Sequence, residues 1–93
     1  MAQVAWAPEA DAKLESLDEA APGAVELILS ATQALQAHPR IGRPVEEGLR
    51  ELVISRGATG YVALYWFDDS TDLVVILALR HQRESGYPEG ELE

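Results

Sequence analysis

The chain has no cysteine and only one lysine, Lys13, among its 93 residues. Without cysteine it forms no disulfide, no thiolate metal site and no cysteine nucleophile, which fits a reducing cytoplasm. No apolar run approaches the roughly 18 residues of a membrane-spanning helix. The opening residues, "MAQVAWAPEADAK", lack the basic start of a secretory signal. We therefore expect a cytoplasmic protein with no membrane span and no signal peptide.

Positive charge is scarce and confined to one part of the chain. The formal net charge is −9, yet all six arginines lie between residues 40 and 83, where six acids balance them. Residues 1–39 carry Lys13 against six acids, and residues 84–93 carry four acids and no base. A chain this acidic does not bind nucleic acid over its whole surface. A local basic site on an acidic body remains possible.

Length and composition favour one small globular domain. Apolar residues make up 47% of the chain and charged residues 25%, which are ordinary globular values. A chain of this size buries roughly 60–65% of the surface of its unfolded form, enough for one modest core. We expect a single domain over residues 1–93, with residues 88–93 ("PEGELE") as a flexible acidic tail.

The first half of the chain is typical of a short strand followed by two helices. Residues 3–6 ("QVAW") favour a strand, and Pro8 suits the first turn of a helix, where its missing N–H costs nothing. Apolar residues then recur at helical spacing up to the break "APG" at 21–23. A second helix is predicted from about Ala24 to Ala37, stopped by Pro39. So short a break predicts an antiparallel helical hairpin.

The second half is typical of strands. Residues 49–55, 61–67 and 73–80 are predicted strands, after a loop at 38–44, and are joined by the turns "RGATG" and "DDSTD". Strands with such short links are antiparallel. The order is β-α-α-β-β-β. This predicts the α+β class, with a helical hairpin packed on an antiparallel sheet.

Two of these strands are apolar on both sides. In residues 61–67 ("YVALYWF") and 73–79 ("LVVILAL"), odd and even positions are all apolar or aromatic. An antiparallel strand with one wet face alternates instead. Two helices cover one face only, so something else is expected on the other: the C-terminal segment, a second copy, or a different protein.

A polar cluster follows the last strand. It consists of Arg80, His81, Arg83, Glu84 and Tyr87. One interpretation is a polar strand end with arginines reaching for solvent. The other is a site for a phosphate or carboxylate, because arginine supplies forked donors and histidine moves protons near neutral pH. Both interpretations remain open from spacing alone.

Other chemistry has little support in the sequence. Neither histidine has a second ligand at metal-binding spacing, and "RGATG" lacks the lysine and serine that end a phosphate-binding loop. No serine, histidine and acid stand in the order of a catalytic triad. We expect no metal and no cofactor.

Four segments together resemble a known family. "VAWAPEADAKLESL", "GRPVEEGLREL", "GYVALYWF" and "LALRHQRESGY" are similar, in this order, to RelE/ParE-type toxins of bacterial type II toxin–antitoxin systems, over about residues 3–87. The resemblance implies the same β-α-α-β-β-β fold. It also implies a hetero-oligomer with a cognate antitoxin that wraps the toxin and covers apolar surface. The expected antitoxin-binding residues are Leu14, Leu17, Tyr61, Tyr65 and Trp66.

The resemblance leaves two branches. RelE-like members cut messenger RNA on the ribosome, whereas ParE-like members are associated with poisoning DNA gyrase, without known nuclease chemistry. The arginine that many relatives carry after the tyrosine of the third strand is replaced here by Val62, which favours the ParE-like branch. The expected target-binding residues are Arg56, Arg80, His81, Arg83, Glu84 and Tyr87. If the chain is RelE-like instead, His81, Arg83 and Tyr87 are the expected catalytic residues. An inactive member that only binds its antitoxin is the third possibility.

Overall fold

The structure is a computed structural model that describes residues 1–56 and 59–81, without the side chains of residues 55, 56 and 59. Two helices and five strands make up these residues. In chain order they are β1 (Gln3–Trp6), α1 (Pro8–Ala20), α2 (Pro22–Gln33), the 3-10 turn η1 (Ala34–Gln36), β2 (Arg43–Glu46), β3 (Leu49–Arg56), β4 (Thr59–Asp68) and β5 (Leu73–His81).

The five strands form one sheet in the order β1-β5-β4-β3-β2. The α+β class and the helical hairpin are confirmed, and β3, β4 and β5 are antiparallel as expected. The sheet as a whole is mixed, because β1 pairs with β5 in parallel. No tight turn joins these two strands, so nothing forces them to be antiparallel.

β2 is an edge strand in a segment predicted mainly as loop. It pairs with β3, and the register shifts between Pro44 and Glu46. Proline is confined to edge strands and bulges, because it has no N–H for the ladder. Pro44 therefore argued against a strand in the sequence, although a proline is tolerated in β2 because β2 lies at the edge of the sheet.

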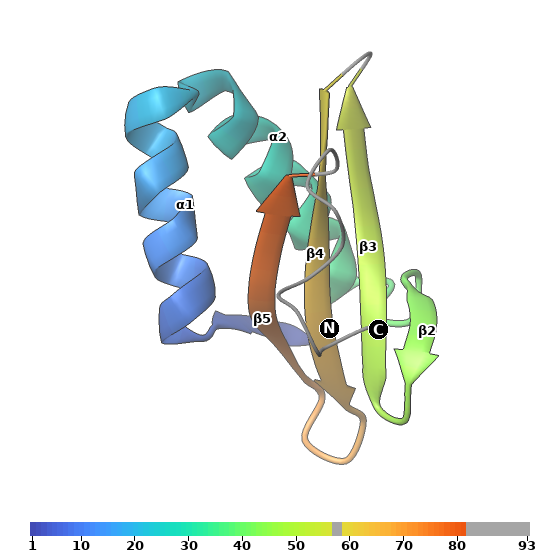
Figure 1. Cartoon of the computed structure of the whole chain (residues 1–93). Coiled ribbons are helices and arrows are strands. Elements are labelled where there is room, and N and C mark those ends of the chain that lie inside the picture. Colours follow the sequence, from blue (N-terminus) through green and yellow to red (C-terminus); the bar gives the residue numbers. More distant parts are fainter. Residues whose placement is uncertain (57–58, 82–93) are drawn as a thin grey trace.

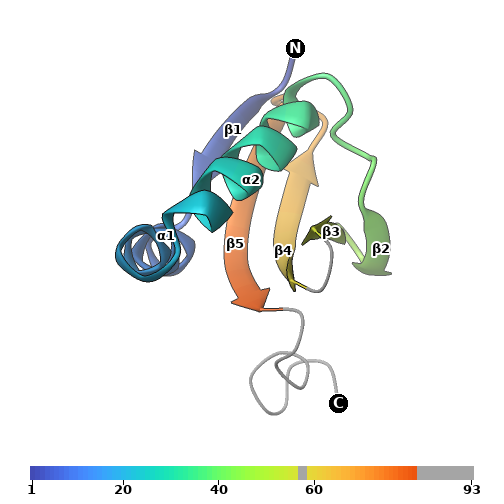
Figure 2. The ribbon, with the colours of Figure 1, turned by 90° about the horizontal axis from the view of Figure 1, so that it is seen from above.

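Both helices lie on one side of the sheet (Figures 1 and 2). Each begins with a proline at its first position, Pro8 in α1 and Pro22 in α2, and only Ala21 separates them. The second helix thus starts two residues earlier than predicted. α1 packs beside β5 and α2, and α2 also contacts β3.

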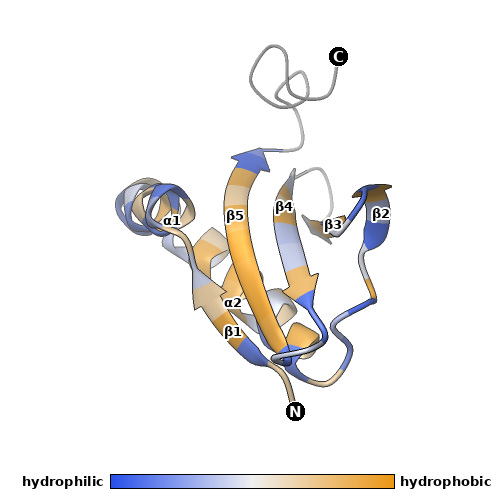
Figure 3. Cartoon of the chain, turned by 90° about the horizontal axis from the view of Figure 1, so that it is seen from below, coloured by the Kyte–Doolittle hydropathy of each residue, from blue (hydrophilic) through white to orange (hydrophobic). Residues whose placement is uncertain are grey.

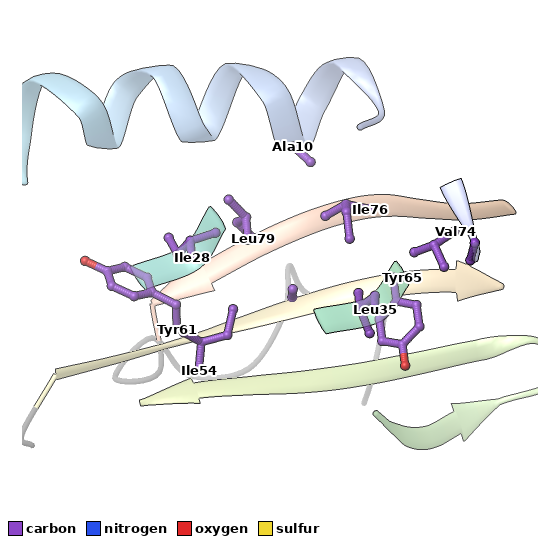
Figure 4. Packing of buried hydrophobic residues seen from close by; sticks show 11 residues of the cluster. Ala10, Ile28, Leu35, Ile54, Tyr61, Tyr65, Val74, Ile76 and Leu79 are labelled. Atoms are coloured by element: carbon purple, nitrogen blue, oxygen red, sulfur yellow. The ribbon is translucent and has the colours of Figure 1, made fainter. Parts of the chain in front are cut away.

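The core lies between α2 and the facing side of the sheet (Figure 4). On β4 the buried residues alternate as Tyr61, Ala63 and Tyr65. On β5 the buried residues of the cluster are Val74, Ile76 and Leu79, because the register of the two strands shifts between Leu64 and Tyr65. The buried cluster contains Ala2, Ala10, Ile28, Leu35, Ile54, Tyr61, Ala63, Tyr65, Val74, Ile76 and Leu79. Because this cluster lies on the helix side of β4 and β5, the opposite face of these two strands is the one that can make contacts outside the core.

The turn between β4 and β5 is the predicted hairpin. The Asp68 carboxylate accepts hydrogen bonds from the backbone N–H and the hydroxyl of Ser70, at 3.0 and 2.7 Å. These bonds lower the pKa of Asp68. Asp72 has a φ of 57°, a left-handed conformation that aspartate tolerates in turns. The turn leads into β5, which is the most continuously hydrophobic of the five strands (Figure 3).

Candidate functional site

Both helices of the described residues lie on one face of the sheet, and none of the described residues forms a helix on the second face. Cross-strand pairing places three rows of side chains on it: Val53, Val62 and Arg80; Glu51, Leu64 and Ala78; Leu49, Trp66 and Val75. We call these nine residues the open face. Seven of the nine are apolar, so the apolar character that the sequence predicted for both sides of β4 and β5 is present in the structure.

Two large apolar side chains of the open face are exposed. Val53 is 52% and Trp66 42% solvent-accessible, and Leu49, Val62, Leu64 and Val75 are half-buried. These residues come from three adjacent strands and form a continuous surface. Exposed apolar surface of this kind marks an interaction site more often than a random surface does.

One ion pair lies at the β2 side of the open face. The Arg43 guanidinium donates to the Glu51 carboxylate at 2.6 Å. The Glu51 side chain is 9% exposed, whereas that of Arg43 is 72% exposed. A nearly buried carboxylate is stable only when paired, so Arg43 serves to hold Glu51.

Arg80 and His81 of the predicted cluster diverge at the end of β5. Arg80 pairs across the sheet with Val62, on the open face, and His81 pairs with Tyr61, on the helix side. The rings of His81 and Tyr61 meet edge to face with centroids 5.0 Å apart. Arg80 lies 3.8 Å from Glu9 of α1. Neighbouring residues of a strand point to opposite faces, so the two side chains leave β5 on different sides, and the Arg80 guanidinium then reaches α1 beside β5.

The remaining predicted target-binding residues lie where the structure gives no side chain. Arg56 ends β3 opposite Thr59, but its side chain is not described. Arg83, Glu84 and Tyr87 lie outside the described residues. Their assignment to the target-binding surface therefore stays a prediction.

The predicted antitoxin-binding residues fall into two groups. Leu14 and Leu17 of α1 are half-buried and pack on the edge of the core, and Trp66 is exposed. Tyr61 and Tyr65 are 4% and 0% exposed, so in this structure they are core residues that present no surface to a partner. Other apolar residues of the open face, among them Leu49, Val53 and Val75, were not among the predicted antitoxin-binding residues. The apolar even-numbered positions of β4 and the uninterrupted apolar run of β5 are the sequence signals for this surface.

Tyr65 has a structural role that the sequence did not reveal. Its hydroxyl donates to the carbonyl of Pro39 at 2.8 Å and accepts from the N–H of Gly42 at 2.9 Å. Burial raises the pKa of Tyr65, and the Gly42 bond and the nearby charge of Arg50 only partly oppose this shift. The hydroxyl therefore stays protonated at neutral pH and remains a donor to the loop.

Replacing Tyr65 by phenylalanine should lower the free energy of unfolding by about 1–3 kcal/mol, because a backbone donor and acceptor lose their partner while the ring still fills the core. A urea titration measures this. Tyr61→Phe is the control, because among the residues that the structure describes its hydroxyl has no hydrogen-bond partner. Equal losses in the two variants would contradict the role given to the Tyr65 hydroxyl.

The described residues contain neither a metal-binding group nor a membrane-spanning helix. No group of three or more histidine and acidic side chains within residues 1–56 and 59–81 is placed to hold a metal ion. Neither described helix has the length and apolar character needed to cross a bilayer.

A helical hairpin on one side of a mixed sheet is consistent with the fold that the resemblance to RelE/ParE-type toxins implied. A family model described as the ParE toxin of the type II toxin–antitoxin system parDE matches residues 4–86. The chain is also 41% identical over 71 residues to "Toxin RelE3" of Caulobacter vibrioides, covering 76% of this chain and 75% of that protein.

This chain therefore belongs to the ParE toxin family of type II toxin–antitoxin systems, as its sequence had indicated. Its class is that of the toxin component, and the family implies a cognate antitoxin as its partner.

Proposed function

We propose that the chain is a cytoplasmic toxin that acts on DNA gyrase without nuclease chemistry and is neutralised when its antitoxin covers the open face. Two questions are separate here: what the toxin attacks, and where the antitoxin binds. The first concerns the end of β5, and the second concerns the apolar rows of the sheet.

The side chains around Val62 are the observation that favours gyrase over RNA as the target. Cleavage of a phosphodiester needs cationic groups or hydrogen-bond donors aimed at the charge that develops in the transition state. Val62 lies at mid-sheet beside Val53, at a position where many relatives carry an arginine. Its cross-strand partner Arg80 lies 3.8 Å from Glu9, and Arg43 of β2 is paired with Glu51. This apolar setting favours a toxin that binds its target over one that cuts RNA.

The apolar rows of the open face support the position of the antitoxin. Antitoxin segments that fold on binding can cover a long surface with few residues. The exposed surface of Trp66 offers an anchor of the residue type that most often dominates binding energy. On α1, the exposed acids Glu9, Asp11 and Glu15 favour basic residues on the antitoxin segment that passes there.

One finding favours the ribonuclease alternative. The relative from Caulobacter vibrioides carries the name RelE3. The family resemblance also implies that Arg83 and Tyr87 correspond to an arginine and a tyrosine of RelE-like members. In that case His81 is the candidate general acid, and its contact with Tyr61 would orient the ring.

Inducing the toxin alone in a bacterium separates the possibilities. We expect DNA breaks and an SOS response, and purified toxin should inhibit supercoiling by gyrase in vitro. Loss of translated messages with cuts inside codons, and no effect on gyrase, would reject the gyrase proposal in favour of the ribonuclease. Normal growth despite soluble expression would indicate an inactive member that only binds its antitoxin.

A further inference from the structure

A second surface stands out at the opposite end of the sheet from Arg80 and His81. The segment 38–42, which we call the loop, follows η1 and leads into β2. It lies beside the end of β4 and the turn between β4 and β5. The Arg40 Cζ lies 5.0 Å from the centroid of the Phe67 ring, and the Arg40 guanidinium donates to the Asp69 carboxylate at 3.0 Å. His81 ends the same strand β5 that begins after this turn.

Two side chains of the sheet fix the backbone of the loop. Tyr65 bonds to Pro39 and Gly42, as described above, and Arg50 donates to the carbonyls of Arg40 and Gly42 at 3.1 and 2.8 Å. Gly42 is required at this place, because an added Cβ would lie 2.6 Å from the Tyr65 ring. Four hydrogen bonds thus hold a five-residue connection in one shape.

The fixed loop presents an apolar side chain to solvent. Ile41 is 58% exposed, and it borders an open hollow of about 420 Å³ lined by His38, Pro39, Arg40 and Ile41. The Arg40 side chain is 59% exposed and also lines a second hollow of about 200 Å³ beside Phe67. Stability of the free chain does not require an isoleucine here, since most of its surface stays in water.

We propose that the loop is a second docking surface for the cognate antitoxin, which places an apolar side chain on Ile41 and a carboxylate beside Arg40. The proposal rests on the toxin–antitoxin function, but not on the identity of the target. Position favours the antitoxin over the target, because the loop is remote from the strand end assigned to target binding.

The chemistry of the loop complements that proposed for α1. On a chain of net charge −9, the loop carries Arg40, which already pairs with Asp69 at 3.0 Å, so an antitoxin carboxylate would share this guanidinium with Asp69. The helix α1 offers acids instead. The antitoxin should therefore be basic where it passes α1 and acidic where it meets the loop. A loop fixed before binding loses little conformational entropy on association, so its contacts contribute fully to affinity.

The test compares Ile41→Ser with Leu29→Ser, which removes a similarly exposed leucine, 41% accessible, from α2. Affinity of the purified toxin for the full-length cognate antitoxin is measured by calorimetry, and toxicity is measured by induction. We expect Ile41→Ser to bind about tenfold more weakly, with unchanged toxicity, because burial of a partly exposed isoleucine is lost. Leu29→Ser should bind within about twofold of the original chain.

Three results would overturn the proposal. They are equal losses of affinity in both variants, no loss in either, and reduced toxicity of Ile41→Ser with unchanged antitoxin affinity. The last would assign the loop to the target. A urea titration checks that Ile41→Ser is folded, and Ile41→Ala serves as a second, smaller change. Failure of the gyrase proposal shows in the lesion that the original chain causes in cells, whereas failure of this proposal shows in how the variants differ from the original chain in affinity and toxicity.

Discussion

Alanine at Arg83 or Tyr87 is expected to abolish the toxicity of the chain without unfolding it. Both residues follow β5 in the sequence and lie outside the described residues. Arginine and tyrosine are the residue types that most often dominate binding energy at an interface, at 2 kcal/mol or more, or at least about 30-fold in affinity. On an acidic chain, Arg83 is also the last basic residue before a tail of acids.

The measurement is growth after induction, with expression and a urea titration as checks on folding. Arg40→Ala is the matched control, because it removes an arginine from the loop at the other end of the sheet. If Arg83→Ala and Tyr87→Ala both remain as toxic as the original chain, the target-binding surface does not lie after β5.

Aspartate at Trp66 is expected to weaken antitoxin binding by about a hundredfold or more, because a charge buried among apolar side chains without a partner costs several kcal/mol. Trp66 lies in the row with Leu49 and Val75, and 42% of it is exposed in the free toxin. Toxicity should persist, so the antitoxin should no longer rescue growth at its normal level.

Trp66→Phe is the conservative control, since it keeps an apolar ring at the same place. Titration of each purified variant with the antitoxin gives the affinities. Unchanged affinity of a folded Trp66→Asp toxin would mean that the antitoxin does not cover this part of the open face.

Much of the fold follows from local patterns in the sequence. Pro8, the break at 21–23 and the two turns between strands define the element order, and the two-sided apolar pattern of β4 and β5 predicted a second face in need of cover. The strand β2 escaped prediction, because Pro44 argues against a strand in every position except an edge.

The sequence did not predict which side of β4 faces the helices. Odd and even residues of the strand are equally apolar, so the pattern carries no information on direction. Tyr61 and Tyr65 were therefore expected at the antitoxin surface, although they lie in the core and Trp66 lies on the open face. The partners of the Tyr65 hydroxyl are 23 and 26 residues away in the chain, beyond the reach of any local pattern.

For the polar cluster, the sequence did not predict where the last strand ends. The last strand was expected to end at Arg80, which left His81 free to join the arginines after it. In the structure β5 includes His81, so alternation along the strand sends Arg80 and His81 to opposite faces.

The emission of Trp66 decides whether the antitoxin binds the open face, as we claim. In a Trp6→Phe toxin, Trp66 is the sole tryptophan. On addition of a tryptophan-free form of the antitoxin, we expect its emission to shift to the blue and its quenching by acrylamide to fall severalfold, because a half-exposed ring becomes buried. Saturating antitoxin with no change in emission or quenching would contradict the claim.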